Sequence, residues 1–146
     1  MEGGMSPQDA VVNDASFTPA VMFLSVAAVS EADRAAGGEP IRIQLQREAG
    51  FRTAAKHQLG IVKEFVEIGA PATSLRRRPV LRRLLAHLEQ HPDIRYAIFP
   101  SARRFALNSA HAQLLTEHFR RLDVRVLLPN QDSQHPVAHS FAETPA

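Results

Sequence analysis

The sequence contains no cysteine, few glycines and no apolar run near the ~20 residues of a membrane-spanning helix. Without cysteine, disulfides, thiol nucleophiles and cysteine-based zinc sites are excluded. The seven glycines form neither a P-loop nor a dinucleotide fingerprint, so a nucleotide cofactor is disfavoured and none is expected. Residues 1–17 are acidic and lack the basic and apolar segments of a signal peptide. We therefore expect a cytoplasmic protein without membrane contact.

Lysine is also rare, because fifteen of the seventeen basic residues are arginine. The charges are unevenly distributed along the chain. Through Glu39 the only basic residue is Arg34, whereas residues 74–125 hold eleven arginines against four acidic residues. Such a basic stretch is compatible with a polyanionic partner.

Hydrophobic patterning predicts alternating strands and helices. Four apolar segments are expected to form strands, at residues 19–30, 61–67, 95–99 and 124–129. Three helical patterns lie between them, at residues 41–58, 79–90 and 108–121. This order predicts an α/β fold with three layers, a mostly parallel four- to five-stranded sheet and helices on both faces. The predicted domain covers residues 19–129, with disordered segments at 1–18 and 130–146.

The carboxyl ends of parallel strands form one edge of a sheet, where α/β proteins bind ligands. Ser30 follows the first predicted strand, residues 67–78 follow the second, and Arg103 and Arg104 follow the third. A serine among arginines suits phosphate chemistry: the arginines neutralise the oxygens, and the hydroxyl binds or attacks phosphorus. No histidine on this edge is placed to act as a base. His87 and His91 have a metal-binding spacing but no evident third ligand, so no metal site is expected.

Five strings occur in order along these elements: "VSEADRA" (29–35), "PIRIQLQRE" (40–48), "EFVEIGAPATSLRRRPVLRRLL" (64–85), "ARRFALN" (102–108) and "LDVRVLLP" (122–129). Together they resemble the catalytic domain of the serine recombinases, the resolvase/invertase family. The family's first strand ends in Tyr-x-Arg-Val-Ser. Its second strand leads into Asp-x-Gly-x-Ser-Gly and Arg-Arg-Pro, and its third into Leu-Asp-Arg-Leu-Ser-Arg-Asn.

The resemblance implies site residues and a reaction. It puts Ser30 at the position of the nucleophile, with Gln44, Arg78 and Arg104 as further active-site residues. Arg77 and Arg103 lie beside these arginines and are expected to bind phosphate. The implied reaction is in-line attack of the serine on a DNA phosphodiester, which leaves a 5′-phosphoserine link. DNA is the implied partner.

The sequence also departs from the family. The arginine two residues before the serine is replaced by Ala28, the acid of the third motif by Arg103, and the next arginine by Leu107. The Ser-Gly of the second loop falls within residues 70–73, which contain neither. A second register remains open, in which "FLSVA" (23–27) is the end of the first strand. It puts Ser25 on the arginine and Ala27 on the nucleophile, whereas the acidic run after Ser30 favours the first register.

We therefore predict a degenerate, stand-alone serine-recombinase domain, associated with DNA recombination, whose strand cleavage is lost or crippled. Without a groove-reading module, little base specificity is expected. The expected protein partners are a second copy of the chain or a full-length recombinase. One alternative is a protein-interaction scaffold that uses the same fold without DNA chemistry. Another is an unrelated phosphate-binding α/β enzyme that uses Ser30 and the arginines.

Overall fold

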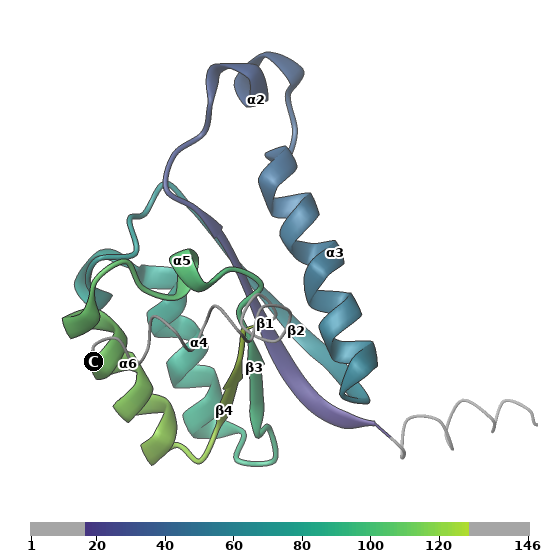
Figure 1. The fold of residues 1–146 in the computed structure, drawn as a ribbon, viewed down its shortest axis with the longest axis vertical. Helices are drawn as coiled ribbons and strands as arrows, with labels where there is room; N and C mark the ends of the chain where they lie inside the picture. The colour runs from purple at the N-terminus through teal and green to yellow at the C-terminus, as the bar shows by residue number, and fades with distance from the viewer. Residues whose placement is uncertain (1–16, 129–146) are drawn as a thin grey trace, which may run out of the picture.

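The predicted sheet is present in a computed structural model, which describes residues 17–128. Its strands are β1 (Thr18–Val26), β2 (Leu59–Ile68), β3 (Tyr96–Ile98) and β4 (Arg125–Leu127). They pair in the order β2-β1-β3-β4, and every pair is parallel (Figure 1). The α/β prediction is thereby confirmed. The predictions of disorder concern residues outside the described range, except for residues 17 and 18, of which Thr18 begins β1.

Helices cover both faces of this sheet. They are α2 (Glu31–Ala36), α3 (Ile41–Lys56), α4 (Pro79–Gln90), α5 (Ala102–Phe105) and α6 (Ser109–Arg121), with a 3-10 turn η1 (Leu75–Arg77) before α4. In Figure 1, α3 lies on one side of the strands, and α4 and α6 lie on the other. The predicted three layers are confirmed.

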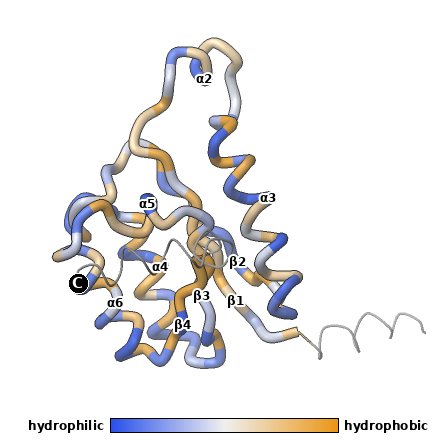
Figure 2. Tube along the Cα trace, in the orientation of Figure 1, coloured by the Kyte–Doolittle hydropathy of each residue, from blue (hydrophilic) through white to orange (hydrophobic). Residues whose placement is uncertain are grey.

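The first strand is buried on both faces, which explains its continuous apolar sequence. Val21 and Phe23 pack against the leucines of α4 and the phenylalanines around α6. Met22 and Leu24 point the other way and pack with Ile43 of α3. The hydrophobic colours of Figure 2 accordingly concentrate along the central strands.

A glycine allows α3 to approach β1 closely. A Cβ atom on Gly50 would lie 2.1 Å from the sulfur of Met22 and 3.2 Å from Cγ of Pro100. Both neighbours are buried between helix and sheet. A side chain at position 50 would therefore push the helix away from the middle of β1.

Several predicted boundaries were wrong. The first strand ends at Val26 rather than at Ser30, and the short helix α2 was not predicted. The turn before β2 uses Gln58, with φ of 58°, and the helix before it ends at Lys56 rather than at residue 58. In contrast, α4 begins at Pro79 and ends at Gln90 as predicted.

Candidate functional site

A cleft of about 490 Å³ opens at the carboxyl end of β1, between the first turns of α3 and the chain around α5. Its walls are formed by ten described residues: Ser25, Val26, Ala27, Arg42, Leu45, Gln46, Ser101, Arg103, Arg104 and Leu107. None of the ten carries a carboxylate, and three are arginines. The cleft therefore has a strongly positive lining.

The three arginines of the cleft differ in how they are held. Arg104 is the most constrained, since its Nε donates to Ser25 Oγ at 3.0 Å and its Nη2 donates to the carbonyl of Ala70 at 2.8 Å. Arg42 donates to the carbonyl of Ala28 at 2.9 Å, and Arg103 is exposed. Burial lowers the pKa of Arg104, and the positive charges of Arg42 and Arg103 lower it further. An anion in the cleft would relieve this mutual repulsion.

Gln46 fixes the end of β1. Its side-chain oxygen accepts from the backbone N–H of Ser25 at 3.0 Å, and its nitrogen donates to the Ser25 carbonyl at 2.8 Å. Ser25 lies beyond the last β1 residue that pairs with β3, which is Met22. The glutamine amide therefore takes the place of a neighbouring strand and keeps the serine backbone satisfied.

Arg78 is fully buried beneath the cleft. Its Nη1 donates to the carbonyl of Phe105 at 2.6 Å and lies 2.9 Å from Nε2 of His111, while its Nη2 donates to the carbonyl of Arg104. The guanidinium also lies over the ring of Phe23, 5.4 Å from its centroid. Arg78 is not among the residues that line the cleft.

Glu67 supplies a negative charge nearby. It is buried at the end of β2, and its Oε2 accepts from the backbone N–H of Val80 at 2.6 Å. Its Oε1 has no hydrogen-bond partner among the described residues. Burial lowers the pKa of both Arg78 and Arg104, and the nearby Glu67 carboxylate partly offsets this by raising both pKa values.

The predicted site residues fall into two groups. Arg103 and Arg104 lie together in the cleft, as the strand order suggested. Ser30, Gln44 and Arg77 do not line it.

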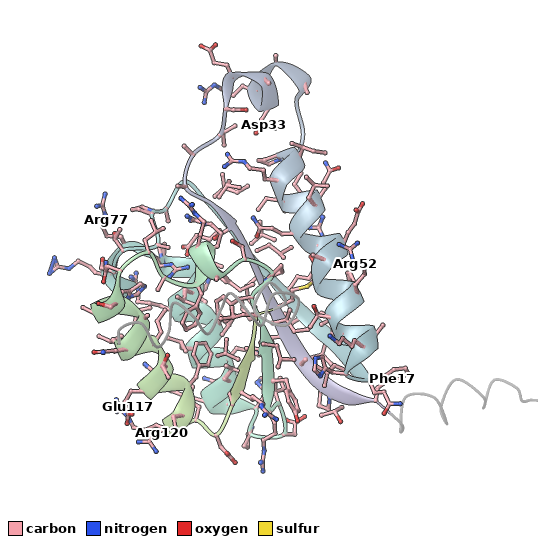
Figure 3. The ribbon with its side chains drawn as sticks, viewed as in Figure 1. Phe17, Asp33, Arg52, Arg77, Glu117 and Arg120 are labelled. Carbon is pink, nitrogen blue, oxygen red and sulfur yellow. The ribbon has the colours of Figure 1, made fainter. Side chains whose placement is uncertain are left out.

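Each of the residues outside the cleft has another place in the fold. Ser30 caps α2: its Oγ accepts from the N–H of Asp33 and donates to the Asp33 carboxylate, both at 3.0 Å. In Figure 1, α2 projects beyond the end of the sheet. Gln44 is exposed and donates to the carbonyl of Glu39, and Arg77 is exposed on the outer edge of the molecule (Figure 3).

Sequence reasoning missed Arg42, Gln46 and Ser101. Helical periodicity could have identified Gln46, because Ile43 and Gly50 are the buried residues of the same face at spacings of three and four. Gln44 lies about 100° around the helix from Ile43, on the solvent side. The second register, with Ser25 and Ala27 at the strand end, matches the strand boundary found in the structure.

No group of three metal-binding side chains occurs within residues 17–128. The rings of His87 and His91 stack, with centroids 4.1 Å apart. In the same range, no helix has the length and apolar character needed to cross a bilayer.

Comparison with protein families gives one match. The model described as "Resolvase, N terminal domain" matches residues 27–144. A search of curated proteins finds no significant match.

Three solved structures with the same fold are distant in sequence. The N-terminal catalytic domain of TP901-1 integrase is 16% identical with a TM-score of 0.60, over 77% of this chain and 79% of that one. The C-terminal catalytic domain of ISC1926 TnpA, an IS607-like serine recombinase, is 15% identical with a TM-score of 0.58, over 76% and 67%. A resolvase family site-specific recombinase from Streptococcus pneumoniae is 14% identical with a TM-score of 0.60, over 77% and 72%. At these identities the likeness establishes the resolvase-like α/β fold.

Proposed function

Because the chain belongs to the resolvase N-terminal domain family, we propose that it binds a DNA phosphate in the arginine cleft without cleaving the strand. The observation that carries this proposal is the end of β1. Three arginines converge there on a cleft without a carboxylate, and the residue that follows the strand is Ala27.

Phosphate binding is supported by the chemistry of the cleft. Guanidinium groups donate two parallel hydrogen bonds to phosphate oxygens and keep their charge at every physiological pH. Arg103 is exposed and so accessible to a ligand, whereas Arg104 is held in place by Ser25 and Ala70. One exposed and one hydrogen-bonded arginine, with Arg42 on the facing helix, provide a clamp for a single phosphodiester.

Loss of cleavage is supported by the second register, in which "FLSVA" (23–27) is the family's first-strand motif; β1 itself ends at Val26, inside that string. In that register alanine replaces the nucleophile at position 27, Ser25 replaces an arginine, and Arg103 replaces the acid. Removing one transition-state contact typically costs ~10²–10³ in rate, and such losses are not additive. The hydroxyl of Ser25 is buried and accepts from Arg104, so it is not available for in-line attack.

Base specificity should be low. Arginine contacts to phosphate position a protein on DNA but carry no sequence information. Binding should weaken steeply as salt rises, because phosphate contacts release counterions. Association with a second copy or with a full-length recombinase stays a prediction of the sequence.

The test combines DNA binding with a cleavage assay. We expect Arg103→Ala and Arg42→Ala each to weaken the binding of a fluorescent duplex, measured by anisotropy at low salt. Arg52→Ala is the matched control, because Arg52 is an exposed arginine of the same helix as Arg42 and does not line the cleft (Figure 3). On supercoiled plasmid, the wild-type chain should produce neither nicks nor a covalent protein–DNA adduct.

Two outcomes would contradict the proposal. Nicking that disappears in Ser30→Ala would show an active nucleophile outside the cleft. Equal DNA affinity of the cleft variants and the Arg52→Ala control would favour the scaffold alternative, in which the fold is kept without DNA chemistry.

A further inference from the structure

The buried Arg78 has contacts unlike those of a ligand-binding arginine. It is 0% exposed, and its three hydrogen-bond partners belong to residues 26 to 33 positions further along the chain. Two of the partners are backbone carbonyls, those of Arg104 and Phe105. These carbonyls belong to the last two residues of α5.

The last carbonyls of a helix lack partners within the helix and are often satisfied by basic side chains. Arg78 therefore caps the carboxyl end of α5 from another part of the chain. This role also explains an otherwise unfavourable placement, since Arg78 is the N-cap residue of α4, where a positive charge opposes the helix dipole.

The helix that Arg78 caps carries two of the three cleft arginines. Arg103 and Arg104 lie on α5, and their side chains line the cleft while the backbone at residues 104 and 105 is tied to Arg78. We propose that Arg78 is a positioning residue: it holds α5 so that Arg104 reaches Ser25 and the cleft, and it does not itself contact the bound anion. This inference rests on the proposed anion-binding function of the cleft.

His111 and the ring of Phe23 keep Arg78 in this position. His111 is buried at the start of α6, and its Nε2 lies 2.9 Å from Nη1 of Arg78. Since a guanidinium can only donate, this nitrogen is the acceptor and the imidazole is neutral. The charged groups that face Arg78 are Glu67 and Arg104. Burial lowers the pKa of Arg78 to about 10, so the side chain remains a cation at neutral pH.

The experiment measures sulfate affinity, because sulfate keeps a fixed charge and carries no base that binds elsewhere. Dissociation constants of the wild-type chain, Arg78→Met, Arg104→Ala and the double variant are obtained by calorimetric titration at low ionic strength. We expect Arg78→Met to weaken binding about tenfold, comparable to the loss of one charge-assisted hydrogen bond. We expect Arg104→Ala to weaken it at least as much, and the double variant to be little weaker than Arg104→Ala alone.

Arg82→Met is the matched control. Arg82 lies one turn further along α4 and also donates to two backbone carbonyls, those of Leu75 and Arg76, at 2.8 and 2.6 Å. Its replacement removes the same charge and the same kind of contact without touching α5. Sulfate affinity of this variant should stay within about twofold of the wild type, the effect of a distant surface charge.

The outcomes separate the two proposals. If Arg104→Ala weakens sulfate binding but Arg78→Met does not, the positioning role is overturned and the anion site stands. If the losses of the two single variants add in the double variant, Arg78 acts independently of Arg104, and the proposal that it positions Arg104 is also overturned. A wild-type chain that binds no sulfate overturns the anion site and the inference together. Should Arg78→Met not fold by circular dichroism, Arg78→Lys decides in the same comparison, because lysine keeps the charge but cannot span both carbonyls.

Discussion

Two serines five residues apart, Ser25 at the end of β1 and Ser30 at the start of α2, have opposite environments. Ser25 is 1% exposed, its backbone is bonded twice to Gln46, and its hydroxyl accepts from Arg104. Ser30 is exposed, and its hydroxyl bonds to the backbone N–H and to the carboxylate of Asp33 in the first turn of α2. The motif resemblance singled out Ser30, whereas the fold assembles its basic cleft around Ser25. In this chain the end of β1 is therefore the part of the strand-to-helix connection that lies beside the arginines.

The largest expected effect comes from placing a thiol at each candidate nucleophile position. The chain contains no cysteine, so Ala27→Cys and Ser30→Cys each carry a single thiol. A duplex with a thiol-reactive group on one phosphate should label Ala27→Cys about a hundredfold faster, because binding in the cleft raises the local concentration of the group. Labelling is measured by gel shift.

The control for this experiment is a small thiol reagent without DNA. Residues 27 and 30 are both exposed, so the two variants should react with it at similar rates. Faster labelling of Ser30→Cys by the reactive duplex would favour the first register, which puts Ser30 at the nucleophile position. It would contradict the proposal that the nucleophile is replaced by Ala27.

Substitution of Gln46, which bonds to the backbone of Ser25, is the next test of the difference between the Ser25 and Ser30 environments. Gln46→Ala should lower the free energy of unfolding by about 2 kcal/mol, because two backbone groups of the buried Ser25 lose their partners. Gln44→Ala, on the exposed side of the same helix, should change it by less than about 0.5 kcal/mol. Urea denaturation of both variants measures the difference. Equal losses would show that the amide of Gln46 is replaced by water.

The caps of α2 and α6 give a smaller contrast. Ser30→Ala and Asn108→Ala each remove a side-chain cap, which is worth about 1 kcal/mol. Because α2 buries none of its residues, its cap loss should appear as faster amide exchange in α2 without a change in global stability. Because α6 buries Leu115 and Phe119, the loss of its cap should lower the global melting temperature. A global effect of Ser30→Ala would show that α2 is coupled to the core.

Much of the fold was predictable because local signals agreed with the tertiary structure. In α4, Pro79 suits the first helical position, and the leucines at 81, 84, 85 and 88 form the buried stripe. The first strand was overextended because Ala27 and Val29 continue its apolar run, although Ala27 is exposed and the pairing with β2 ends at Val26. Apolar character alone does not show at which residue a strand stops pairing with the neighbouring strand.

The site was only partly predictable. Arg103 and Arg104 could be found because residues after a buried parallel strand gather at one edge of the sheet. Gln46 was within reach of helical periodicity, but motif matching favoured Gln44 instead. The burial of Arg78 could not be predicted from sequence, since it depends on η1, α5 and α6 meeting at one guanidinium.

The last difference between the two regions is their response to acid. The backbone N–H of Ile41 lowers the pKa of Asp33 below its ordinary value of 3.8, and the hydroxyl of Ser30 lowers it further. A carboxylate with a depressed pKa stabilises the folded state above its unfolded pKa, and this contribution is lost as pH falls through the folded pKa. The amide signal of Ile41 should therefore titrate with a midpoint below 3.8, and Ser30→Ala should move that midpoint upward. The amide of Ser25, which donates to Gln46 and not to Asp33, should not follow the Asp33 titration while the chain stays folded. A shared midpoint would mean that the start of α2 and the cleft respond to protons as one unit.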